Sequence, residues 1–171
     1  MTARELTLRH VFAAWLLGWV CLGPAWAVQA DDSIAVIVGK KPTNIGFDRA
    51  NLEDIFLKRI QVDDSHAALA PINLAATDPI RVALSLDLFG QKPASLQRYW
   101  TERYFHGISP PYTVRSQESM LRFIADTPGA IGYVANCRVD DRVHVVARLA
   151  VPAELAGPVR QECEKGEQGA E

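Results

Sequence analysis

The residues of this chain that could best hold a ligand lie where two helices are expected to begin. Asp78-Pro79 marks the first helix start, with the hydroxyl of Thr77 before it and the guanidinium of Arg81 one turn in. Ser116 marks the second helix start. Free amides and the helix dipole favour an anion at such places, and hydroxyls and guanidinium groups also bind oxygen atoms. Thr77, Asp78, Arg81 and Ser116 are therefore the residues whose place and chemistry bear on a small-anion site.

Asp78 limits how well this site could work. An aspartate before the first turn accepts hydrogen bonds from the amides that an oxyanion needs, and Pro79 removes a further donor. A like charge within ~4 Å of an anion can cost several kcal/mol in a partly desolvated site. Asp78 can therefore be a helix cap alone or part of a weak anion site, and the sequence leaves both interpretations open.

Other reactive residue types form no familiar catalytic or metal-binding pattern. Asp63-Asp64-Ser65-His66 has no further ligands at zinc-like spacing, which favours a solvated loop. The sequence contains no Gly-x-Ser-x-Gly, P-loop or dinucleotide motif. A formal net charge of −2 gives no electrostatic footprint for nucleic acid. We therefore expect a protein that is not an enzyme and has no cofactor, no metal and no nucleic-acid partner.

The first 27 residues have the composition of an export signal. Arg4 and Arg9 form a basic start, residues 11–22 are almost wholly apolar, and Ala25-Trp26-Ala27 offers small residues for cleavage. An uncleaved anchor is the alternative, because a membrane helix needs ~20 apolar residues. The composition predicts a signal peptide over residues 1–27 and a periplasmic protein.

Two cysteines, Cys137 and Cys163, follow the expected signal. In an oxidising compartment they could pair, closing a loop of about 26 residues that is worth roughly 3 kcal/mol in the chain-entropy model. Two unpaired thiols are the alternative. We favour the disulfide because free thiols in such a compartment are liable to oxidation.

Residues 28–150 have the size of one domain, in which short apolar runs alternate with helical patterns. Strands are expected at 33–38, 69–74, 130–134 and 143–147, and helices after Asp48, Asp78, Lys92 and Ser116. This alternation predicts an α/β fold with a mixed sheet flanked by helices. The charged residues after Gly157 predict that the C-terminal tail, 151–171, is partly disordered.

Four aromatic residues crowd the third expected helix: Tyr99, Trp100, Tyr104 and Phe105. Large aromatics at helical spacing favour a core position. A ligand pocket or a groove for a partner protein is the alternative for the same residues.

Three motifs resemble the phosphate-binding component of ABC importers. The strand at 34–38 followed by Leu52-Glu53-Asp54-Ile55-Phe56-Leu57 is similar to that family's strand-to-helix segment. Pro128-Gly129-Ala130-Ile131-Gly132-Tyr133-Val134 is similar to its SGAIGYV strand. Trp100 with Phe105-His106-Gly107 fits the intervening helix of a short, single-lobe branch of the superfamily. The likeness covers roughly residues 33–136.

The resemblance implies one lobe of a type-II periplasmic binding protein-like fold. In the family, a Ser-Gly-Thr turn at a helix start helps to hold phosphate, and residues 75–79 stand at the matching place. The resemblance therefore also implies an exported, non-catalytic protein that binds phosphate or another small anion as its solute. The alternative is an accessory protein that has lost ligand binding and docks on a periplasmic sensor or an inner-membrane complex.

Overall fold

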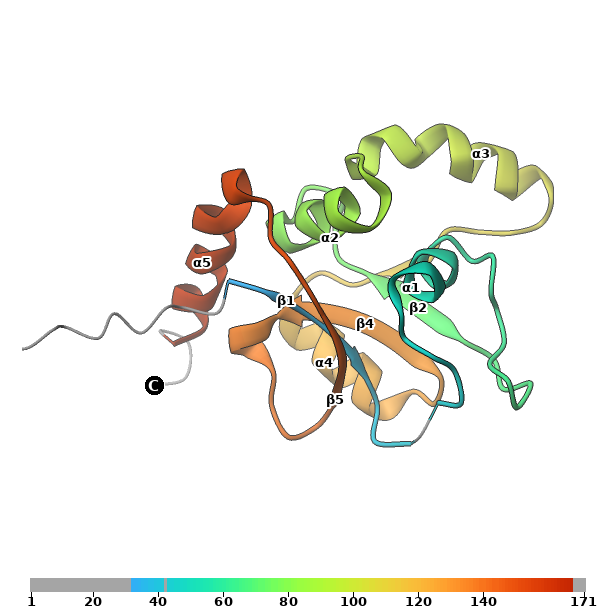
Figure 1. Cartoon of the computed structure of the whole chain (residues 1–171), viewed down its shortest axis with the longest axis horizontal. Helices are drawn as coiled ribbons and strands as arrows, with labels where there is room; N and C mark the ends of the chain where they lie inside the picture. The colour runs from blue at the N-terminus through green and yellow to red at the C-terminus, as the bar shows by residue number, and fades with distance from the viewer. Residues whose placement is uncertain (1–31, 42, 168–171) are drawn as a thin grey trace, which may run out of the picture.

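A computed structural model describes residues 32–41 and 43–167 of the protein (Figure 1). The expected signal peptide lies outside the described residues. Within the described ranges, no helix combines the length and apolarity needed to span a membrane.

The centre of the fold is a five-stranded mixed sheet in the order β3-β2-β4-β1-β5. Strand β1 is antiparallel to β4 and β5, whereas β2 is parallel to β3 and β4. The strands are β1 (Ile34–Val38), β2 (Ala70–Asn73), β3 (Tyr112–Thr113), β4 (Ala130–Ala135) and β5 (His144–Leu149). The predicted α/β fold with a mixed sheet is confirmed.

The helices follow the local signals in the sequence. They are α1 (Arg49–Phe56), α2 (Pro79–Phe89), α3 (Gln97–Phe105), α4 (Gln117–Asp126) and α5 (Ala153–Glu167), with short 3-10 turns η1 (Pro93–Leu96) and η2 (Asn136–Arg138). Asp48, Asp78 and Ser116 cap α1, α2 and α4 by accepting hydrogen bonds from first-turn amides, as residues of these types prefer to do.

Helices cover both faces of β4. A Cβ on Gly132 would lie 2.4 Å from Sδ of Met120, so the missing side chain lets α4 pack closely on this face. The next residue, Tyr133, points to the opposite face and places its ring 5.6 Å from the ring of Phe56 in α1. Strands β1 and β4 are buried along their whole length, as expected for strands covered on both faces.

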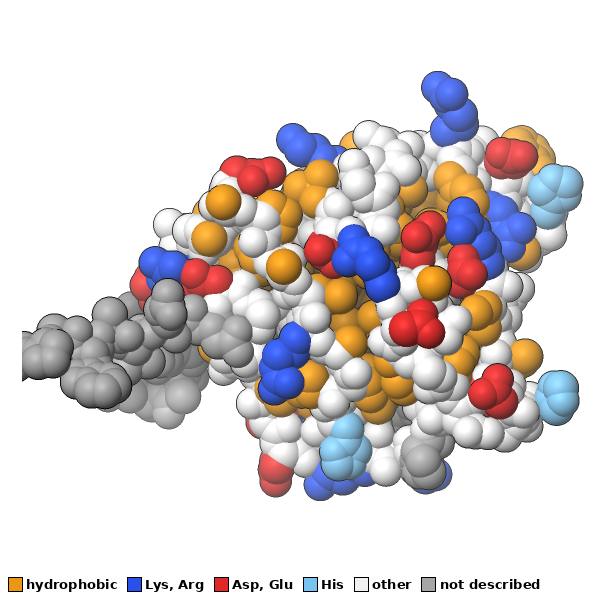
Figure 2. Space-filling model, in the orientation of Figure 1, with side chains coloured by type: hydrophobic (Ala, Val, Ile, Leu, Met, Phe, Trp, Pro, Cys, Tyr) orange, Lys and Arg blue, Asp and Glu red, His pale blue; other side chains and the backbone are white. Residues whose placement is uncertain are grey.

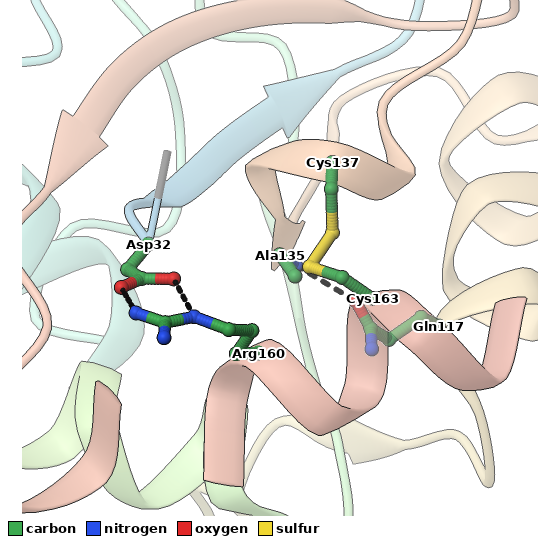
Figure 3. Close-up of a disulfide and its surroundings, with 6 residues drawn as sticks. All are labelled: Asp32, Gln117, Ala135, Cys137, Arg160 and Cys163. Carbon is green, nitrogen blue, oxygen red and sulfur yellow. Dashed lines mark hydrogen bonds and ion pairs between the residues drawn. A yellow bond between two sulfur atoms is a disulfide. The ribbon is translucent and has the colours of Figure 1, made fainter. Parts of the chain in front are cut away.

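Helix α5 differs from the expectation of a partly disordered tail, because the chain is helical from Ala153 to Glu167. Val159 is fully buried, and Cys163 forms a disulfide with Cys137. Arg160 pairs with Asp32 beside this bridge (Figure 3). The charged composition therefore reflects an exposed helix face. Apolar packing of Val159 and Leu155 and the predicted disulfide, which the structure confirms, fix the helix to the rest of the fold. In Figure 1, α5 and α3 lie at opposite ends of the molecule.

Candidate functional site

Arg81, in the first turn of α2, is a buried cation with no carboxylate partner among residues 32–41 and 43–167. Its side chain is largely enclosed, with 6% of the residue exposed. One nitrogen, Nη1, donates to Oδ1 of Asn73 at the end of β2. None of the ion pairs between described residues includes Arg81. A cation in the first turn also lies at the unfavourable end of the helix dipole. Buried charges are normally paired, so the positive charge of Arg81 could be compensated by a bound anion.

The side chain of Asn73 is held so that its amide nitrogen remains available. Its Oδ1 accepts from Arg81 and also from the hydroxyl of Tyr133, 3.2 Å away. That hydroxyl accepts in turn from the amide of Leu74 at 3.0 Å. Burial raises the pKa of Tyr133 to about 12, so the phenol stays protonated and can donate. The side-chain carbonyl oxygen of Asn73 thus accepts two hydrogen bonds, one for each of its lone pairs. The side-chain NH₂ group of Asn73 makes no hydrogen bond to a described residue.

Arg81 and Asn73 border an open cleft of about 220 Å³. The cleft lies between the end of β2, the start of α2, the η1–α3 segment and the chain leading into β3. Trp100, Pro93 and Pro111 contribute apolar surface to it. A guanidinium and an amide next to apolar walls can bind an oxyanion through charge-assisted hydrogen bonds in a place where water is partly excluded.

The structure separates the four residues that the sequence groups into one site. Arg81 borders this cleft, whereas Asp78 and Ser116 line a second hollow of about 190 Å³, together with Glu162 and Lys165 of α5. Thr77 is exposed and lines neither hollow. The side chains of Asp78 and Ser116 thus border a different hollow from the guanidinium of Arg81, although Asp78 and Arg81 belong to the same helix start.

Both helix starts are already capped by the protein. The Asp78 carboxylate accepts from the amide of Ile80 at 2.9 Å, and burial raises its pKa. The hydroxyl of Ser116 accepts from the amide of Ser119 at 3.1 Å. These contacts use amides that an anion would otherwise bind at the two helix starts. The hollow there still has cations on its border, at Arg115, Arg138 and Lys165, but they share it with the carboxyl groups of Asp78, Glu118 and Glu162.

Asn73 and Tyr133 are the site residues that sequence reasoning missed. Asn73 ends an apolar strand just before the Asp78 turn, which is the one local signal that could have drawn attention to it. Tyr133 lies in the Gly129–Val134 motif but is 60 positions from Asn73, so its hydrogen bond depends on the pairing of β2 with β4.

The loop at Asp63 differs from the expected solvated loop, because the Asp63 carboxylate is enclosed by its own loop. Asp63 is buried and accepts hydrogen bonds from Ser65, Asn44 and Ala67. The side-chain hydrogen bond from Ser65, helped by backbone amides, lowers the Asp63 pKa to about 2. In the part of the chain that the structure describes, no cluster of His, Cys, Asp and Glu could hold a metal ion.

No protein-family model matches this sequence, and neither does any curated protein. Among solved structures, the fold is similar to an ABC-type phosphate transport receptor from Vibrio cholerae, with a TM-score of 0.51 and 17% identity over 67% of this chain and 45% of the receptor. It is also similar to a protein assigned as a phosphate ABC transporter substrate-binding protein, with bound phosphate, from Clostridium perfringens (TM-score 0.49, 15% identity, 77% of this chain and 60% of that chain). A third similar structure is that of PstS from Borrelia burgdorferi, with a TM-score of 0.44 and 17% identity over 61% of this chain and 41% of PstS.

The chain spans less than two thirds of the length of each of these proteins. At such low identity the likeness concerns the fold alone, and it agrees with the predicted α/β fold, a mixed sheet flanked by helices that corresponds to one part of the Vibrio cholerae receptor.

Proposed function

We propose that this chain is an exported, non-catalytic solute-binding protein that holds a small anion in the cleft beside Arg81. The observation that carries the proposal is the enclosed guanidinium of Arg81, which has a neutral hydrogen-bond partner and no carboxylate among the described residues. Export to the periplasm is supported by the composition of the first 27 residues and by the disulfide, which persists in oxidising compartments.

In this proposal the anion supplies the negative charge that Arg81 lacks among the described residues. Its oxygen atoms accept hydrogen bonds from the unused N–H groups of Arg81 and from the amide of Asn73. Asp78, half-buried at the same helix start, adds a negative charge that opposes the anion. Since the cleft is open, water competes for the same donors, and we expect a weak complex.

Thermal unfolding with and without sulfate, phosphate and acetate tests the proposal. Binding at 100 times the dissociation constant adds roughly 2.7 kcal/mol to the free energy of unfolding. Arg81→Met should abolish the stabilisation by anions, whereas Arg98→Ala, at an exposed position on α3, should keep it. An absence of stabilisation by any anion at millimolar concentration, or equal stabilisation of the Arg81→Met protein, would overturn the proposal.

The second candidate is an accessory protein that docks on a periplasmic or inner-membrane partner. It is favoured by the exposed aromatics at the end of α3, where Tyr104 is 66% and Phe105 is 82% exposed. The capped starts of α2 and α4 also fit a lobe that has lost ligand binding. Co-purification with membrane proteins that is lost on Tyr104→Ser/Phe105→Ser, combined with no response to anions, would favour this candidate.

A further inference from the structure

The Arg81 cleft has a single charged donor among its lining residues. Arg81 supplies it, and the lining residues Asn73, Gln97 and Thr113 carry neutral side-chain donors. Two parallel N–H···O bonds from a guanidinium match the two oxygens of a carboxylate. Free phosphate near neutral pH is a mixture of monoanion and dianion with four oxygens, so it brings more charge and more acceptor sites than one guanidinium matches.

The local charge leaves an anion little net attraction. Arg81 contributes one positive charge, and Asp78, the cap of the same helix, contributes a negative one less than a turn away. Attraction to Arg81 and repulsion from Asp78 both scale with the charge of the ligand, so they offset each other in part for a monoanion and a dianion alike. Charge therefore gives a phosphate dianion no clear advantage over a carboxylate, and contacts with the apolar part of the ligand decide the selectivity.

The remaining walls favour a ligand with an apolar part. Trp100 and Pro111 are buried residues that border the cleft, and Pro93 lies beside them. When a hydrocarbon group binds here, its apolar surface and that of the cleft are both removed from water, which stabilises the complex. An inorganic anion has no apolar surface and gains no such stabilisation. The volume of about 220 Å³ exceeds the ~150 Å³ of an engineered cavity that accepts benzene, so a ring with a carboxylate can fit.

Building on the proposed function, we propose that the cleft selects a small organic monocarboxylate with a compact apolar group. The carboxylate lies against Arg81 and Asn73, and the apolar group lies against Trp100. This assigns a substrate class that differs from the phosphate bound by the structural neighbour from Clostridium perfringens.

Trp100 gives a direct optical probe for this proposal. The other three tryptophans, Trp15, Trp19 and Trp26, all lie in the first 27 residues, so removal of the expected signal leaves Trp100 as the single tryptophan. The exported form is purified, its mass is checked, and its fluorescence is titrated at constant ionic strength with cyclohexanecarboxylate, acetate or inorganic phosphate. A Trp100→Phe protein identifies the emission that belongs to Trp100.

The proposal predicts that cyclohexanecarboxylate binds at least about tenfold more tightly than acetate and phosphate, because only it buries an apolar ring. Arg81→Met should weaken its binding at least tenfold, and Arg98→Ala should leave it unchanged. If phosphate or acetate binds through Arg81 as tightly as cyclohexanecarboxylate does, the substrate class is overturned while the proposed function stands. If no anion binds, or if binding persists in Arg81→Met, both the substrate class and the proposed function fail.

Discussion

Enclosing the guanidinium of Arg81 costs free energy, and no carboxylate among the described residues offsets it. Replacement of a buried charge by an apolar residue of similar volume is often neutral or stabilising, by up to about 4 kcal/mol. We therefore expect Arg81→Met to unfold, without ligand, at an equal or higher urea concentration than the natural protein. A marked loss of stability in Arg81→Met would instead mean that Arg81 holds the fold together.

The proposed anion binding should depend on pH through Asp78. Burial raises its pKa above the ordinary aspartate value, so its neutral form accumulates at a higher pH than usual. Because the charged form is the one that burial disfavours, Asp78 destabilises the fold above this raised pKa, and the effect fades as the pH falls through it. Neutralisation also removes a repulsion, so sulfate, which keeps its charge in this range, should bind more tightly as the pH falls.

Asp78→Asn tests that link, since asparagine caps a helix about as well as aspartate. We expect the variant to bind sulfate more tightly at pH 7 and to lose most of the dependence on pH, as measured by calorimetric titration. Asp48→Asn, the matching change at the cap of α1, is the control and should leave sulfate binding as it was. Equal affinity in natural protein and Asp78→Asn would show that Asp78 does not act on the site.

The hydroxyl of Tyr133 orients Asn73 and supports the end of β2. Tyr133→Phe leaves the amide of Leu74 without its partner, which should destabilise the protein by about 1–3 kcal/mol in urea unfolding. It should also weaken anion binding, because the side chain of Asn73 can then rotate. Tyr99→Phe removes another hydroxyl bonded to the backbone, at the oxygen of Leu57, and should leave anion binding unchanged. An effect on stability with no effect on binding would assign Tyr133 a purely structural role.

At the scale of the elements, α5 depends on its bridge to η2. The Cys137–Cys163 disulfide closes a separation of 26 residues, for which the chain-entropy model gives roughly 3 kcal/mol. Cys137→Ser/Cys163→Ser should lower the urea midpoint accordingly and speed amide exchange across residues 153–167. The exposed ion pair of Arg160 with Asp32 should matter little, so Arg160→Ala serves as the control. Unchanged exchange in the double variant would show that apolar packing alone holds the helix.

Elements with strong local signals could be predicted from the sequence. The run of β-branched residues at β1 and the caps Asp78 and Ser116 define their elements within a few positions. Strand β3 was missed, since it has two residues and forms only because Asn73 and Thr113 pair across the sheet. The structure differs from the predicted partial disorder at residues 153–167, where a helix forms because the predicted disulfide and the packing of Val159 and Leu155 outweigh the charged composition.

The candidate site could be predicted only in part. Arg81 stood out because it is a cation close to a helix start. Its partner Asn73 was missed although it lies only 8 positions away. The supporting hydroxyl of Tyr133 could not be found, since its contact with Asn73 joins two strands that are 60 positions apart in the sequence. The separation of Arg81 from Asp78 and Ser116 likewise follows from the direction of each side chain, which the order of residues does not reveal.

At the scale of the whole molecule, the fold supplies one lobe and an open cleft. The chain covers 45% of the length of the Vibrio cholerae receptor, so it matches only a part of that protein. Figure 2 shows acidic and basic side chains interspersed over one face, in keeping with a formal net charge of −2. Such a surface gives little long-range attraction for an anion, so selectivity has to come from contacts inside the cleft.

Nuclear magnetic resonance of the arginine side chains tests the central claim most directly, because the Nε–H signal of each guanidinium reports on its own surroundings. On titration with cyclohexanecarboxylate, we expect the Arg81 signal to shift in a saturable way, together with the side-chain amide signals of Asn73. The exposed Arg98 and Arg115 should shift little. A saturable response at other arginines with the Arg81 and Asn73 signals unmoved would contradict the account.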